Sequence, residues 1–163
     1  MRGEGRQPPA ARLAAALAMA GGAVLLAAAG LTVVSGLLRW WTSQPVRGDF
    51  ELVSVGSGLA VMSFLAWGAW RQANIIVDSF TTWLPAAVLR AIDAFWLCAF
   101  AGAMALLAWR MAVGGLEGMR SGVRTIGLLA MPYGWAIALG AGCFALTALL
   151  SLLRAWRVLR GGA

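Results

Sequence analysis

The chain has 163 residues, of which 61% are hydrophobic and only 12% are charged. Soluble globular domains carry about 25% charged residues, so this composition excludes a water-soluble enzyme and a disordered chain. The net charge of +7 comes from arginines scattered singly between apolar stretches, which is typical of membrane topology signals and not of a nucleic-acid partner. The sequence has no histidine, and this excludes bis-histidine haem ligation and the usual zinc and di-iron sites.

Four stretches are apolar enough to cross a membrane, which takes about 20 apolar residues. Arg90 and Asp93 stand three residues apart in the third of them, where they can pair near the membrane edge. Pro85 suits the first turn of the same stretch, because its missing N–H costs nothing there. The four stretches form a single membrane domain over residues 1–163. The predicted transmembrane helices cover residues 13–38, 50–70, 85–109 and 132–153.

With four spans, both ends of the chain lie on the same side of the membrane. That side carries eight arginines and the opposite side five, which favours cytoplasmic termini and places residues 39–49 and 110–124 in the periplasm. The first span is longer than the apolar part of a signal peptide, about 7–15 residues, so we expect it to be retained. Trp40 and Trp41 follow this span, as expected of side chains that favour the headgroup layer.

The middle of each predicted span carries hydroxyl groups but no acidic or basic side chain, because Glu51 and Asp93 stand near the beginnings of the second and third spans. A transmembrane helix that is uninterrupted and has no charge near the bilayer midplane offers no evident translocation pathway, catalytic centre or cofactor site of its own. The chain therefore resembles a subunit of a larger complex. We expect the hydroxyls to bond to the backbone of their own helix. They belong to Ser35, Ser54, Ser57, Ser63 and Thr147.

Small residues are frequent in the spans. Cys98 and Cys143 each lie in an apolar run, so we expect small buried side chains and neither a disulfide nor a thiolate metal site. Other small residues recur four positions apart, a spacing that lets helix backbones approach closely, and we expect these faces to pack within the bundle. They are Ala14, Ala18 and Gly22; Ser54 and Gly58; and Gly134, Ala138 and Gly142.

Residues 71–83 connect the second and third spans. Ile76, Phe80 and Trp83 occur at positions i, i+4 and i+7, which suits a short helix lying in the plane of the membrane interface. An ordinary amphipathic loop fits the same residues equally well. The predicted fold is therefore an all-α membrane protein with four transmembrane helices and a short interfacial amphipathic segment between helices 2 and 3.

Several short segments occur in order around the second, third and fourth spans. An acidic pair, Asp49 and Glu51, opens the second span. Arg71 precedes residues 74–78 (N-I-I-V-D), and the sequence Leu-Pro at 84–85 and then Arg90 come next. Residues 126–129 (I-G-L-L) lie before the fourth span, and residues 138–140 (A-L-G) lie within it.

The order and spacing of these segments over residues 35–155 resemble the small permease (Q) subunit of tripartite ATP-independent periplasmic (TRAP) transporters. In that family a histidine is common at the position of Asn74, and prolines occur at those of Leu129 and Ala138. The resemblance implies a small inner-membrane subunit that acts as a scaffold for a large multi-span permease and is not an enzyme. A periplasmic solute-binding protein would deliver an organic acid, and a sodium gradient would drive its uptake.

The same resemblance and the positions at span borders indicate where the chain meets its partners, which are the large permease, the binding protein and membrane lipid. No catalytic, cofactor-binding or metal-binding residue is predicted. The candidate partner or interface residues are Trp40, Trp41, Asp49, Glu51, Arg71, Asn74, Asp78, Arg90, Asp93 and Gly140.

Three other classes of membrane protein compete with this interpretation. A non-haem membrane-anchor subunit of a respiratory or other membrane complex fits the four spans and the lack of histidine, and it is the main alternative. A small membrane enzyme needs converging catalytic groups, and these are not evident in the sequence. A homo-oligomeric channel needs a polar stripe along one helix, and no span carries one.

Overall fold

A computed structural model describes residues 9–71, 85–122, 124, 129, 130 and 132–160. These residues form the helices α1 (Pro9–Thr42), α2 (Asp49–Arg71), α3 (Ala86–Arg120) and α4 (Gly134–Leu159). All four are long and apolar enough to cross a membrane, which confirms the predicted all-α membrane fold. The predicted interfacial segment falls mostly on residues 72–84, outside the described part of the chain.

The local sequence explains where α3 begins and ends. Pro85 caps the start of the helix with a φ of −58°, so its missing N–H costs no helical hydrogen bond. At the other end the N–H and the hydroxyl of Ser121 both donate to the carbonyl of Glu117, at 2.8 and 2.7 Å. Gly122 follows with a φ of +63°, the left-handed conformation that commonly stops a helix.

This helix continues past the expected end at Trp109 to Arg120. The prediction placed the end just before Arg110, the first charged residue after Asp93. A charge marks where the apolar layer stops, whereas the helix itself stops only at the Ser-Gly pair. At a rise of about 1.5 Å per residue the 35 residues of α3 span about 52 Å, more than the roughly 30 Å of bilayer hydrocarbon. In a membrane, α3 must therefore tilt or project beyond the apolar layer.

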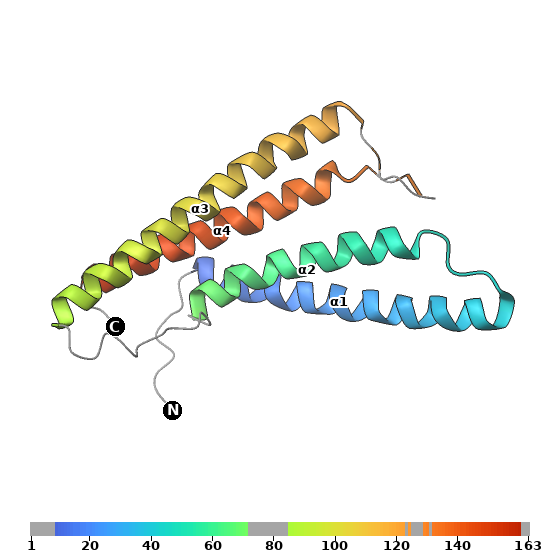
Figure 1. The fold of residues 1–163 in the computed structure, drawn as a ribbon, viewed down its shortest axis with the longest axis horizontal. Helices are drawn as coiled ribbons and strands as arrows, with labels where there is room; N and C mark the ends of the chain where they lie inside the picture. The colour runs from blue at the N-terminus through green and yellow to red at the C-terminus, as the bar shows by residue number, and fades with distance from the viewer. Residues whose placement is uncertain (1–8, 72–84, 123, 125–128, 131, 161–163) are drawn as a thin grey trace.

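The four helices are arranged as two antiparallel hairpins, α1–α2 and α3–α4 (Figure 1). The hairpins meet where α2 packs on α4, and α1 touches α4 only lightly. They are close together at the end that carries the start of α1 and the end of α4, and they diverge toward the end that carries the α1–α2 and α3–α4 connections (Figure 1). We call these the terminal end and the loop end.

Each hairpin closes along a line of small side chains seven residues apart. A seven-residue repeat stays on one helix face when two helices wrap gently around each other, and small residues let the backbones approach closely. The expected four-residue spacing is less consistent, since Gly22, Gly58 and Gly142 have open space where a Cβ would stand. The buried lines are Ala14, Gly21, Ala28 and Ser35 on α1, and Ala94, Ala101, Ala108 and Gly115 on α3.

Hydroxyl groups inside the helices mostly follow the prediction. Ser57, Ser63 and Thr147 donate to the carbonyl four residues earlier, at 2.6, 2.8 and 2.8 Å. For Ser35 the prediction was wrong, because its hydroxyl donates to the carboxylate of Asp49 instead. The start of α2 lies within reach of this position on α1, and an ionised acceptor makes a stronger hydrogen bond than a carbonyl that the helix already uses.

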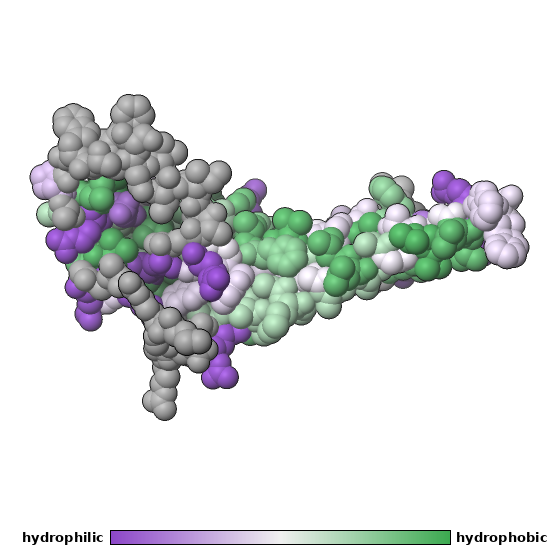
Figure 2. Space-filling view, turned by 90° about the horizontal axis from the view of Figure 1, so that it is seen from below, coloured by the Kyte–Doolittle hydropathy of each residue, from purple (hydrophilic) through white to green (hydrophobic). Residues whose placement is uncertain are grey.

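The surface of the molecule has the zones of a membrane protein. Strongly hydrophilic residues gather at one end, the opposite tip is mostly pale with a smaller hydrophilic patch, and a largely apolar surface lies between them (Figure 2). The most buried core lies at the terminal end, where Ala14, Ala66 and Leu150 pack together with Trp67 and Trp70 partly covering them. Of the two cysteines, Cys143 is buried as expected, whereas Cys98 is exposed on α3.

Candidate functional site: the two ends of the helix bundle

The acidic pair at the start of α2 forms hydrogen bonds to other parts of the chain at the loop end. The carboxylate of Asp49 accepts hydrogen bonds from the hydroxyl of Ser35 on α1 and from the N–H of Phe50, the latter at 2.7 Å. The oxygen of Ser35 also accepts from the N–H of Val46 at 3.2 Å. The α1–α2 connection is therefore tied to α1 by one buried hydroxyl, and the carboxylate complements the positive N-terminus of α2.

Glu51, the second member of the pair, reaches the other hairpin. Its side chain is only 8% exposed, and it accepts a hydrogen bond of 3.1 Å from the N–H of Leu129 in the α3–α4 connection. The side chain of Leu129 lies against Gly48, which is buried and has a φ of +75°. We call Gly48, Glu51 and Leu129 the loop clasp, because they join the two hairpins where their helices diverge.

At the terminal end, arginine and tryptophan side chains join α2 to α4. Arg154 donates to the carbonyl of Trp70, one of the last carbonyls of α2, which lack partners within their own helix. Three further guanidinium groups lie over indole rings, with distances from Cζ to the ring centroid between 4.4 and 5.6 Å. These pairs are Arg71 with Trp67 at 5.6 Å, Arg157 with Trp70 at 5.0 Å and Arg160 with Trp156 at 4.4 Å.

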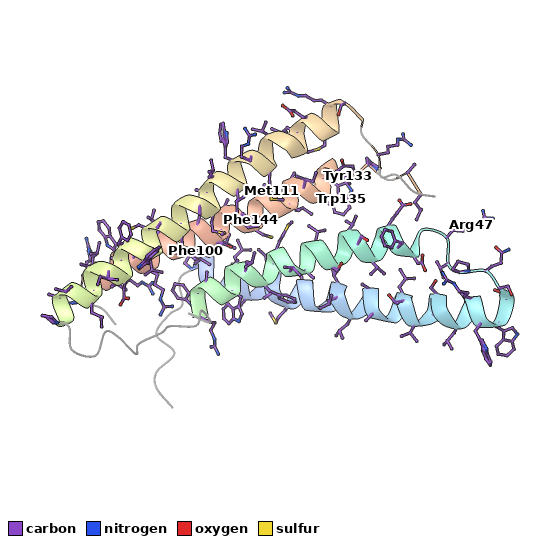
Figure 3. All side chains as sticks on the ribbon, in the orientation of Figure 1. Arg47, Phe100, Met111, Tyr133, Trp135 and Phe144 are labelled. Carbon is purple, nitrogen blue, oxygen red and sulfur yellow. The ribbon has the colours of Figure 1, made fainter. Side chains whose placement is uncertain are left out.

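An apolar groove of about 310 Å³ lies between the two hairpins. Met111 of α3 and Tyr133, just before α4, both line it (Figure 3). Among the described residues that line the groove, Ser54 and Tyr133 alone have a polar side-chain group. This described lining can bind apolar groups, but it contains no acid–base pair and no charge that could attract an ionic solute.

Gly140 lies buried in α4, where three helices meet. A Cβ at this position would overlap the sulfur of Met62 on α2 and would stand 2.9 Å from the methyl carbon of Met111 on α3. The glycine thus allows contacts within the chain, and its predicted role at a partner interface gains no support from this packing. No group of three or more histidine, cysteine or carboxylate side chains that could hold a metal ion occurs in the described part of the chain.

The remaining candidates are distributed over both ends of the bundle. Trp40 and Trp41 are 84% and 85% exposed at the end of α1, and Arg90 and Asp93 are exposed near the start of α3. Asn74 and Asp78 lie outside the described residues. The structure does not bring the candidates together as one site, and instead it adds contacts that the sequence analysis missed. The residues behind these contacts are Ser35, Leu129, Arg154 and Arg157.

Four long apolar helices with polar ends define a multi-pass membrane protein. A family model described as "Tripartite ATP-independent periplasmic transporters, DctQ component" matches residues 28–161. The chain belongs to this family, which confirms the resemblance and favours a transporter component over an anchor subunit or an enzyme. No curated protein and no solved structure matches the chain.

Proposed function

We propose that this small TRAP subunit works in a sodium-coupled, binding-protein-dependent transporter for organic acids, as a scaffold for the large permease subunit. The observation that carries the proposal is the lack of charged residues in the middle of the helices. Between Arg12 and Arg39 on α1, and between Asp93 and Arg110 on α3, the sequence has no charged residue. Sodium and a carboxylate solute need polar or charged groups near the bilayer midplane, so we place both binding sites in the large permease.

The outer face of α1 supports a scaffold role. Opposite its buried line of small residues, α1 carries a second line of large apolar side chains with the same seven-residue spacing. In a lone chain they would face lipid, and in a complex they provide a straight ridge for a helix of the large permease. The side chains of this ridge are Met19, Leu26, Val33 and Trp40, all well exposed.

Reconstitution in liposomes tests the scaffold proposal. The chain alone is expected to give no sodium-dependent uptake of an organic acid. Addition of the large permease and of binding protein loaded with solute is expected to give uptake, because the permease then has its stationary partner. Vesicles with permease and binding protein but without this chain are the control. Sodium-driven uptake by the isolated chain, or full uptake by the control vesicles, would contradict the proposal.

We also propose an inner-membrane orientation with cytoplasmic termini, supported by the distribution of arginines. Gly122 is the best internal position for a reporter, because it follows α3 in a turn and has open space around it. Gly115 is unsuitable, since it is buried inside α3. Alkaline phosphatase is expected to be active when inserted at Gly122 and inactive at the C-terminus. The reverse result would overturn the orientation, and equal activity at both sites would overturn the four-span topology.

A further inference from the structure

The terminal end concentrates positive charge on α2 and α4. Arg71, Arg157 and Arg160 lie on indole rings, and Arg154 donates to a backbone carbonyl. Within the described part of the chain, these contacts are with rings and a carbonyl, none of which carries a full negative charge. We call the four arginines, with Trp67, Trp70 and Trp156, the arginine–tryptophan cluster.

The positions of these guanidinium groups over indole rings suit them to bind an anion. The ring face attracts the positive charge of the guanidinium, and this attraction requires none of its five N–H donors. The N–H edge of the guanidinium matches the oxygens of a phosphate group, which can accept two parallel hydrogen bonds. Because each ring restricts its arginine, less side-chain freedom is lost when the anion binds. The cluster is thus suited to a phosphate group.

An apolar track leads from the cluster toward the middle of the molecule. Leu149, Leu152 and Trp156 follow one another on α4 with spacings of three and four residues, and all three are exposed. They therefore share one helix face. Trp156 ends this track and also carries the guanidinium of Arg160, at 4.4 Å from its ring centroid. A ligand that fits both parts has an anionic headgroup and an acyl chain.

We propose that the arginine–tryptophan cluster is a binding site for an anionic phospholipid. The phosphate lies against the guanidinium edges of Arg71, Arg157 and Arg160, and an acyl chain follows the track on α4. Indole rings favour the headgroup layer, which is where a lipid phosphate stands. Charge complementarity and the continuous apolar track favour lipid over free phosphate and over an acidic protein segment. The site is independent of the direction in which the chain crosses the membrane.

Native mass spectrometry of the full chain, purified in mild detergent, tests the site. Phosphatidylglycerol and phosphatidylcholine are titrated in parallel, and the wild-type chain is expected to retain the anionic lipid preferentially. The double variant Arg157→Gln/Arg160→Gln is expected to bind phosphatidylglycerol about thirtyfold more weakly, because each arginine near the membrane surface contributes a factor of about five. The matched control, Arg39→Gln/Arg47→Gln, removes the same charge at the loop end and is expected to bind as the wild type does.

Three results would overturn the lipid site. Equal losses of phosphatidylglycerol affinity in the cluster variant and the matched control would show that only the net charge of the chain matters. Displacement of the lipid by excess inorganic phosphate would identify a free-phosphate site. Loss of the lipid when the large permease binds the chain would assign the cluster to a protein contact.

Because the cluster variant can also misfold, brominated lipids provide a measurement on the wild type. Brominated phosphatidylglycerol is expected to quench tryptophan fluorescence more than its phosphatidylcholine analogue, and equal quenching would also overturn the proposal.

Discussion

Replacement of Gly134 by leucine is expected to separate α3 from α4 and to lower the free energy of unfolding by about 3 kcal/mol. A Cβ at this position would stand 2.8 Å from the backbone nitrogen of Met119 and 3.0 Å from the carbonyl oxygen of Gly115. Backbone atoms cannot rotate away as a side chain can, so the two helices must move apart. The α3–α4 packing along Ala94, Ala101 and Ala108 would then be weakened as well.

Gly142 provides the matched control for this prediction. It lies on the same helix, but a Cβ there would meet nothing within 4 Å. Gly142→Leu is expected to leave stability unchanged or to raise it by up to about 1 kcal/mol, since leucine favours a helix more than glycine does. Unfolding in mixed micelles of mild detergent and sodium dodecyl sulfate, followed by circular dichroism, measures both variants. Equal stability of the two variants would show that the close approach of α3 and α4 is not required.

The sequence was sufficient to predict the helices, because apolar stretches of transmembrane length have few other solutions. It was less informative about helix ends and helix packing. The end at Trp109 was placed by charge, while the helix is terminated by the local chemistry of Ser121 and Gly122. The seven-residue lines of small residues were present in the sequence, but a chain rich in alanine and glycine offers many spacings. Which of these spacings forms the buried line depends on which face of each helix packs against its neighbour.

The sequence was sufficient to predict where the candidate residues lie along the helices, but not which residues they contact. Asp49 and Glu51 were expected at the start of α2, yet their hydrogen-bond partners lie in other parts of the chain, Ser35 on α1 and Leu129 before α4. Leu129 was visible as a departure from the family pattern, which has proline there. Proline has no N–H, so the bond to Glu51 depends on this departure. The sequence pattern indicates only a topology signal for Arg154 and Arg157, because a one-dimensional pattern does not place them beside Trp70.

Gly48→Ala is expected to open the loop clasp and to lower the free energy of unfolding by about 2–4 kcal/mol. Two effects add at this position. The φ of +75° disfavours any residue with a Cβ, at a cost of about 1–2 kcal/mol. The new methyl would also overlap the end of the Leu129 side chain, with the Cγ of Leu129 only 2.6 Å away. Displacement of Leu129 would break its hydrogen bond to Glu51 and leave a buried carboxylate oxygen without that donor.

A second substitution separates the two effects. Leu129→Ala removes the overlapping side chain but keeps the N–H that donates to Glu51, so Gly48→Ala/Leu129→Ala is expected to recover about 1–2 kcal/mol of the loss. Gly122→Ala isolates the backbone effect, because Gly122 has a φ of +63° and nothing within 4 Å of a Cβ. Its smaller loss is expected to be insensitive to Leu129→Ala. If the double variant were no more stable than Gly48→Ala alone, overlap with the Leu129 side chain would not contribute to the loss at Gly48.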